Sequence, residues 1–205
     1  MPMSAILKKT IACIVTLVCI ALFVLGAYLP LRKSQMYIVA YGALSKVRSL
    51  DDFNRTFDPV ISYYSPIGQE ELVSAYLGII VDAVSRDPGP DKAIADVLIK
   101  NAEAKAKPIL ADAPSFSYSQ TILKLAALNK VAAGRYKDET YYKRAVELFK
   151  MGLVYSPNRP AFLYNLLDLY LSHNDAGGTK ETAQVILKYW PNDKNIQGIW
   201  EALQK

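Results

Sequence analysis

The sequence is poor in the residues that build metal centres and covalent active sites. It has two cysteines and one histidine in 205 residues, and both cysteines lie in an apolar run near the N-terminus. Neither a disulfide framework nor a zinc site with thiolate ligands is therefore expected in the remainder. The single histidine, His173, stands in a polar stretch, where we expect a solvated loop side chain rather than a lone catalytic base. Because a glycine-rich phosphate loop is also missing, we predict no catalytic residue, no metal ion and no cofactor.

Most of the chain also lacks an excess of charge of one sign. The sequence has 24 Lys and Arg against 19 Asp and Glu, but Lys8, Lys9, Arg32 and Lys33 all flank the apolar run. From residue 34 onward, 20 basic residues therefore stand against 19 acidic ones. Proteins that bind nucleic acid usually carry a basic stripe that neutralises phosphates. This near-neutral remainder argues against a nucleic-acid partner.

What the sequence does have is one long hydrophobic run. Residues 10–29, TIACIVTLVCIALFVLGAYL, contain no charged side chain. As a helix they measure about 30 Å, which matches the hydrocarbon core of a bilayer. The run is longer than the apolar core of a signal peptide, about 7 to 15 residues, and no A-x-A cleavage site follows it. We therefore expect an uncleaved transmembrane helix, and since Gly26 has no small partner at the required spacing, no homo-oligomer is indicated.

These observations divide the chain into four parts. We expect a short basic N-terminus (1–9), a transmembrane helix in contact with lipid (10–29), a juxtamembrane linker (30–35) and a helical domain (36–205). The linker is expected because Pro30 should end the helix. Basic residues on the two sides of the span nearly balance, and a short basic N-terminus retained inside favours an extracytoplasmic domain. The localisation predicted is a single-pass membrane protein.

The fold class predicted for the domain is all-α. From residue 36 onward apolar residues recur at helical spacing, and no sustained two-residue alternation favours a sheet. Ser49 and Asp91 stand at predicted N-caps, Gly134 at a predicted C-cap, and Pro108 and Pro114 at helix ends. The candidate helices are residues 36–47, 50–63, 69–85, 91–105, 118–133, 141–155, 161–172, 180–189 and 194–203.

An internal repeat runs through these helices. Four positions that are spaced by four, three and five residues, the last of them a proline, recur in residues 145–157 and 179–191. Residues 53–66 contain a degenerate copy. Leucines and a tyrosine ahead of the second copy complete a unit of about 34 residues. The repeat-signature residues are Phe53, Phe57, Ala145, Phe149, Gly152, Pro157, Leu163, Leu166, Leu167, Tyr170, Ala183 and Pro191.

This spacing resembles the tetratricopeptide-repeat family over roughly residues 118–191. The resemblance implies a solenoid of about three to four helical hairpins after the membrane helix, with a groove that binds a protein or peptide. Asn165 and Asp168 fall on the polar side of the helix that carries the signature leucines. Together with Lys130, they are the predicted partner-groove residues.

Two segments also resemble the repeat-bearing C-terminal tails of O-antigen ligase and polymerase-type membrane proteins, namely residues 57–71 and 153–160. That family has many membrane spans, whereas this sequence has one, so polymerase chemistry is not carried over. We predict a non-catalytic, membrane-anchored scaffold or adaptor that binds a protein partner near the bilayer. Two alternatives stay open: an accessory component of cell-surface polysaccharide polymerisation or export, and an enzyme with an unrecognised site.

Overall fold

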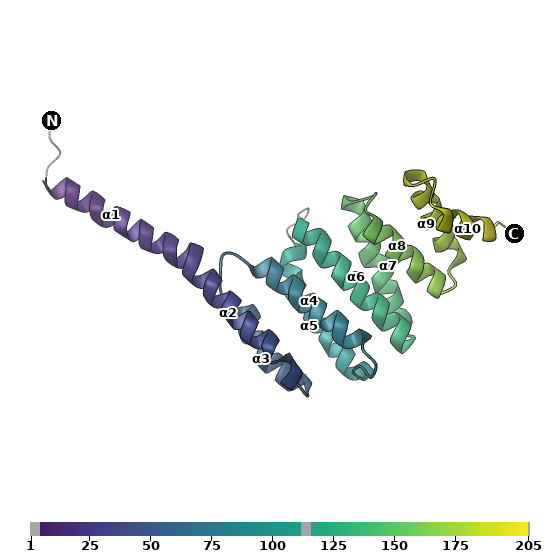
Figure 1. Cartoon of the computed structure of the whole chain (residues 1–205), viewed down its shortest axis with the longest axis horizontal. Coiled ribbons are helices and arrows are strands. Elements are labelled where there is room, and N and C mark those ends of the chain that lie inside the picture. The colour runs from purple at the N-terminus through teal and green to yellow at the C-terminus, as the bar shows by residue number, and fades with distance from the viewer. Residues whose placement is uncertain (1–4, 112–115, 205) are drawn as a thin grey trace. The chain divides into compact units, whose positions relative to one another are not determined.

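The structure, a computed structural model, describes residues 5–111 and 116–204 of the chain (Figure 1). Within these two ranges every regular element is a helix, so the prediction of an all-α fold is confirmed. The chain divides into two compact units, which we call the first unit (residues 1–72) and the second unit (residues 73–205).

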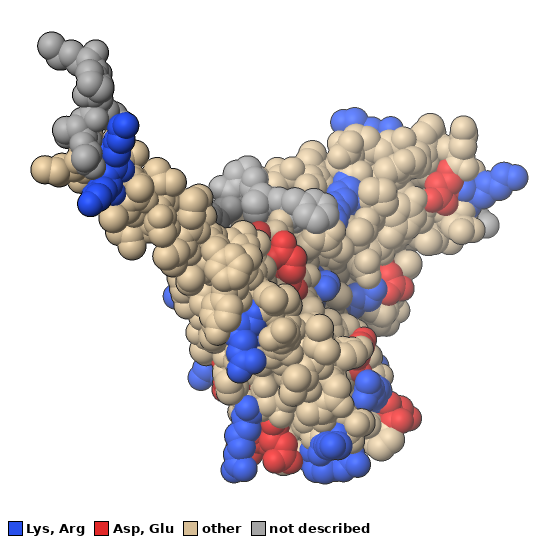
Figure 2. Space-filling model, turned by 60° about the vertical axis from the view of Figure 1, so that its left-hand side comes forward, with Lys and Arg blue, Asp and Glu red and all other residues tan. Residues whose placement is uncertain are grey.

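The first unit begins with a long continuous helix. It consists of α1 (Ala5–Phe23), a π-helical turn η1 (Val24–Tyr28) and α2 (Leu29–Gly42), and a short 3-10 turn η2 (Leu44–Lys46) follows it. The 41 residues Ile6–Lys46 are long and apolar enough to cross a membrane, and the most apolar stretch has a mean hydropathy of 2.7. Figure 2 shows a stretch of this helix without charged side chains, with basic side chains near its outer end.

The break expected at Pro30 does not occur, and residues 30–35 are helix instead of a linker. Pro30 stands in the first turn of α2, directly after η1, where the Leu29 N–H donates to the Val24 carbonyl. A proline has no N–H to donate, and its ring presses on the carbonyl four residues earlier. The wider π turn accommodates both defects. The direction of the apolar helix therefore continues through α2.

The second helical layer of the first unit is α3 (Leu50–Ser62), which packs against α2. Ser49 caps α3 as predicted, since its hydroxyl accepts a hydrogen bond from the Asp52 N–H at 3.1 Å. The signature residues Phe53 and Phe57 are buried, with ring centroids 4.9 Å apart. The sequence pattern thus identified the buried face of this helix.

Lys33 fastens α2 to the end of α3. Its side chain is 3% exposed, and its ammonium donates to the Tyr63 carbonyl at 2.8 Å and to the Gln69 side chain. A buried ammonium is costly unless its N–H groups are hydrogen-bonded. The carbonyls at the C-terminal end of a helix carry partial negative charge, which suits a cation. This basic residue therefore belongs to the interior of the first unit, and not to a solvated membrane flank.

The helices of the second unit pack in chain order. Each helix from α5 onward contacts the next, and α6 also contacts α8, which is the packing of helical repeats (Figure 1). The helices are α4 (Gln69–Ser85), which starts in the first unit, α5 (Lys92–Leu110), α6 (Phe116–Tyr136), α7 (Glu139–Tyr155), α8 (Pro160–Ser172), α9 (Ala176–Tyr189) and α10 (Lys194–Ala202).

The core of the second unit consists of the apolar stripes predicted from the repeat. The signature prolines Pro157 and Pro191 lie exposed in turns. Gly152 lies where α7 approaches α8, and a Cβ added there would be 2.3 Å from the ring of Phe162. The buried signature residues of this unit are Ala145, Phe149, Gly152, Leu163, Leu166, Leu167, Tyr170 and Ala183.

The last helix covers the end of this core. Ile196 of α10 joins a buried cluster that contains Leu163 and Ile186. Trp190 and Trp200 are partly buried and pack against the same cluster. Because α10 follows α9 without a further hairpin, it closes the apolar face that α9 would otherwise expose.

Two predicted helix ends are wrong. Pro108 lies inside α5, in its last turn, where one missing hydrogen bond costs little and buried Ile109 keeps the turn packed. Gly134 is not a C-cap, because α6 continues to Tyr136, whose hydroxyl donates to the Pro90 carbonyl at 2.7 Å. The left-handed residue that follows the helix is Lys137, with φ 52°. At the end of α6, the Tyr136 contact joins residues 46 positions apart in the sequence.

Another boundary also moves. The polar stretch 174–178 was expected as a loop, but α9 begins at Ala176, because Asp175 caps it and accepts from the Gly178 N–H at 2.8 Å. The cap predicted at Asp91 is confirmed by a bond of 2.8 Å from the Ile94 N–H. The helix end predicted at Pro114, and residues 1–4 of the predicted basic N-terminus, lie outside the described residues.

Replacing Gly152 with alanine should lower the free energy of unfolding by about 1 to 3 kcal/mol, because the new Cβ collides with the ring of Phe162. Gly134→Ala is the matched control, since a Cβ at this helical position meets nothing within 4 Å. It should raise the free energy of unfolding by up to about 1 kcal/mol. Urea unfolding of the detergent-solubilised chain, followed by circular dichroism, measures both changes. A Gly152→Ala variant as stable as the parent would contradict the packing of α7 on α8.

Candidate functional site

The three predicted partner-groove residues lie together on α6 and α8. The Lys130 ammonium donates to the Asn165 Oδ1 at 2.9 Å and pairs with the Asp168 carboxylate at 2.6 Å. The Asn165 amide also donates to the Ala161 carbonyl at 2.8 Å, which orients its oxygen toward Lys130. We call Lys130, Asn165 and Asp168 the polar cluster. It joins the first helices of two successive hairpins.

The polar cluster is open to solvent on one side. The side chain of Asp168 is 67% exposed, whereas that of Lys130 is 21% exposed. An exposed ion pair of this kind adds only about 0 to 1 kcal/mol to stability. The Asp168 carboxylate has more acceptor positions than the contact with Lys130 uses. The arrangement can therefore accept hydrogen bonds from the N–H groups of a peptide.

A second lysine of α6, Lys124, connects α6 with the earlier helix α4. Lys124 donates to the Ser74 carbonyl of α4 at 2.7 Å. Burial lowers the pKa of the Lys124 ammonium, and the charge of Asp82 opposes this change. Sequence reasoning missed Lys124, although a lysine within a largely apolar stretch of α6 was a usable signal. Together, Lys124 and Lys130 connect α6 with α4 and with α8.

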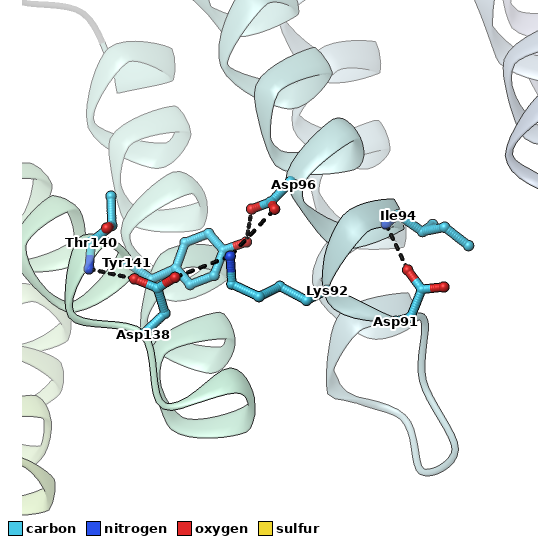
Figure 3. A network of polar contacts seen from close by, with 7 residues as sticks. All are labelled: Asp91, Lys92, Ile94, Asp96, Asp138, Thr140 and Tyr141. Atoms are coloured by element: carbon cyan, nitrogen blue, oxygen red, sulfur yellow. Dashed lines mark hydrogen bonds and ion pairs between the residues drawn. The ribbon is translucent and has the colours of Figure 1, made fainter.

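A further polar network joins α5 to the start of α7 (Figure 3). Lys92 pairs with the Asp138 carboxylate at 3.0 Å and with the Asp96 carboxylate at 3.4 Å. The Tyr141 hydroxyl donates to the Asp96 carboxylate. Asp138 is at the same time the N-cap of α7, because it accepts from the Thr140 N–H at 2.7 Å. One aspartate thus caps a helix and anchors it to a neighbouring hairpin.

The ionisation of this network favours a structural role. The Thr140 N–H and then the Lys92 ammonium lower the pKa of Asp138. The bond to Asp138 raises the pKa of Lys92, and burial followed by the Asp96 contact raises the pKa of Tyr141 well above its usual range. Lys92 and Tyr141 therefore keep their protons near neutral pH. Neither side chain is available as a general base there.

The next two turns repeat the same design. The Tyr142 hydroxyl donates to the Asp175 carboxylate at 2.9 Å, and the Tyr164 hydroxyl donates to the Asp193 carboxylate at 2.5 Å. Asp175 and Asp193 are the N-caps of α9 and α10. Sequence reasoning missed these pairs because their members are 33 and 29 residues apart.

We call the contacts of the capping residues Asp138, Asp175 and Asp193 with neighbouring helices the joints. His173 lies at the joint of Asp175. Its ring stacks on the ring of Tyr142, with centroids 3.8 Å apart and planes 10° from parallel. His173 lies in the turn between α8 and α9, as expected, but its side chain is half-buried by this stack instead of fully solvated. The stack places two aromatic rings at the turn that precedes α9.

An apolar groove lies between α7 and α9, with α8 as its floor. It has a volume of about 400 Å³, and Val154 on its α7 side is 74% exposed. Lys150 and Glu181 stand among the apolar lining residues. This groove could not be predicted, because it depends on how far α7 and α9 stand apart. Its size suits a few apolar side chains of a ligand peptide.

The described residues include no group of three or more His, Cys, Asp or Glu side chains placed to hold a metal ion. Comparisons with protein-family models, with curated proteins and with solved structures find no match to this chain. Over residues 5–111 and 116–204, the fold therefore defines the class: all-α, with helical-repeat packing and one helix that is long and apolar enough to cross a membrane.

The joint at Asp175 should make the free energy of unfolding depend on pH in the acidic range. The Gly178 N–H and then the Tyr142 hydroxyl lower the pKa of Asp175, so the native state binds fewer protons than the unfolded state. The resulting stabilisation is complete above the unfolded pKa, about 3.9, and is lost as the pH falls through the lower native pKa. Asp175→Asn should therefore weaken the loss of unfolding free energy below about pH 4. Thermal unfolding across this range measures the slope.

Tyr142→Phe is the companion variant. It removes the second contributor to the lowered pKa of Asp175 and keeps the helix cap. It should lower the free energy of unfolding by about 1 kcal/mol at neutral pH. The further decrease in this free energy below about pH 4 should lie between those of the parent and of Asp175→Asn. An Asp175→Asn variant that lost stability in acid as steeply as the parent would contradict this account.

Proposed function

We propose that this protein is a membrane-anchored scaffold whose helical repeats bind a protein or peptide partner close to the bilayer. The observation that supports this proposal best is the polar cluster. Three side chains from two successive hairpins converge at one partly exposed place. Convergence from separate repeats is the usual way in which stacked hairpins build a binding surface.

The membrane part of the proposal rests on the long N-terminal helix. Its uncharged segment, residues 10–29, is about as long as the hydrocarbon core is thick, and basic residues flank it on both sides. No side chain in its most apolar stretch is buried in the fold, so water is a poor environment for it. A tether of this kind raises the local concentration of the repeats near other membrane proteins.

The binding part rests on two surfaces of the second unit. The polar cluster offers hydrogen-bond acceptors, and the groove between α7 and α9 offers apolar surface. The contact between α6 and α8 supports the proposed kinship with tetratricopeptide repeats, in which the first helices of successive units are neighbours. A role in surface-polysaccharide polymerisation stays a prediction from sequence resemblance.

The double change Asn165→Ala and Asp168→Ala should weaken partner capture about tenfold, as expected when a polar contact worth about 1.4 kcal/mol is lost. Asn195→Ala with Glu201→Ala is the matched control, since it removes the same chemistry from exposed positions of α10. Crosslinking in native membranes, affinity capture and quantitative mass spectrometry measure the difference. Capture that is equal in all three proteins would eliminate the polar cluster as a binding site.

Removal of residues 1–29 should release the protein from membranes while leaving it folded. The cut is placed before Lys33 so that the bonds of Lys33 to Tyr63 and Gln69 survive. Carbonate extraction should leave the full chain in the membrane fraction and the shortened chain in solution. A full chain that is extracted by carbonate would refute the anchor.

The captured proteins also separate the two functional alternatives. Recovery of glycan polymerases that depends on residues 1–29 would favour the polysaccharide role. Capture of the same unrelated proteins by both chains would favour a general adaptor.

A further inference from the structure

The first unit carries apolar side chains on a part of α2 that lies beyond the proposed span. Ile38 is 67% exposed and Val39 is 73% exposed. They stand nine and ten residues after Leu29, the end of the uncharged run. Because the helix continues without a break, they lie about 14 to 15 Å farther along its axis. Exposed apolar surface of this kind usually marks a contact with another molecule.

Lipid is the wrong occupant for this surface. The headgroup region adds only about 5 to 8 Å on each side of the hydrocarbon core. A helix tilted by about 40°, the upper end of the usual range, still raises Val39 about 11 Å above the hydrocarbon boundary. The surface around Val39 therefore faces water unless a protein covers it.

A groove beside Val39 gives this surface a defined shape. It lies between α2 and α3, within the first unit, and has a volume of about 370 Å³. Its lining includes Arg32, Met36 and Val39 of α2, Ala43 directly after α2, and Pro59 and Val60 of α3. The small side chain of Ala43 lets another helix approach closely.

The charge at the membrane end of the groove narrows the choice of partner. Arg32 is exposed and lines the groove next to the bilayer boundary. Copies of one membrane protein insert in the same orientation, so a symmetric contact through this groove would bring the Arg32 side chains of the two copies together. Like charges at such a contact oppose it. A partner with an acidic side chain at the same depth would be attracted instead.

We infer that the groove between α2 and α3 receives the juxtamembrane helix of a second, different membrane protein. This helix continues from a transmembrane segment, fills the groove with apolar side chains, and presents an Asp or Glu to Arg32. The inference rests on the proposed membrane anchoring and specifies the class of partner that meets the protein at the bilayer surface. It is independent of the polar cluster, which lies in the second unit.

Site-specific photocrosslinking of the full chain in native membranes tests this assignment. A benzophenone amino acid replaces Val39 in one variant and Ser34 in the other. Ser34 is the matched control, because it is exposed on the same helix but stands about 140° around it from Val39. We expect an adduct from position 39 that is about tenfold stronger than that from position 34. Mass spectrometry should place the adduct next to a transmembrane helix of the partner.

Two substitutions test the chemistry of the contact. Arg32→Glu should remove most of the adduct from position 39, whereas Arg32→Lys should keep it. Ala43→Phe should abolish the adduct by filling the groove, and it leaves the charge unchanged. Carbonate extraction of each variant verifies that the chain is still anchored.

Several results would overturn the inference. These are an adduct with a second copy of the chain, an adduct with the chain's own repeat helices, an adduct with lipid alone, and equal adducts from positions 34 and 39. Each would leave membrane retention and the effect of Asn165 and Asp168 on capture intact, so the proposed function would survive it. Extraction of the full chain by carbonate would instead remove the anchor and this inference together.

Discussion

An amphipathic helix must cover its apolar stripe, and in the described part of this chain only another helix is present to do so. The packing of the second unit follows from this constraint. From α5 onward each helix packs against the next, until α10 ends the series. The close approach of α7 to α8 shows how tightly this burial is built, since the ring of Phe162 occupies the space that a side chain at position 152 would need.

Polar contacts at the turns add to the apolar packing between these helices. Asp138, Asp175 and Asp193 each cap a helix and each bind a side chain of another helix. Since one carboxylate has several acceptor positions, both tasks fit on one residue. The polar cluster differs from these joints, because the Asp168 carboxylate is mostly exposed and caps no helix. This difference is why we assign the cluster to binding and the joints to structure.

The first unit carries the helix that we propose as the membrane anchor, and it continues this helix into α2 without a flexible link. The π turn at η1 lets the helix run through Pro30, and Lys33 fastens its continuation to the end of α3. A rigid exit of this kind holds α2 and α3 at a defined height above the proposed bilayer boundary. On the proposed anchoring, the exposed side chain of Val39 stands above that boundary, which is why we assign the surface around it to a protein partner.

The sequence by itself determined the features that depend on near neighbours along the chain. These include the apolar span, the all-α class, the bounds of α4, the caps at Ser49 and Asp91, and the buried faces of the repeat helices. Helical periodicity and capping act over a few residues, so a single sequence records them. Tertiary structure alone decided the course of the helix beyond Gly134, the place of His173 and the burial of Lys33. Each of these depends on a partner about 30 or more residues away, and no local pattern contains that distance.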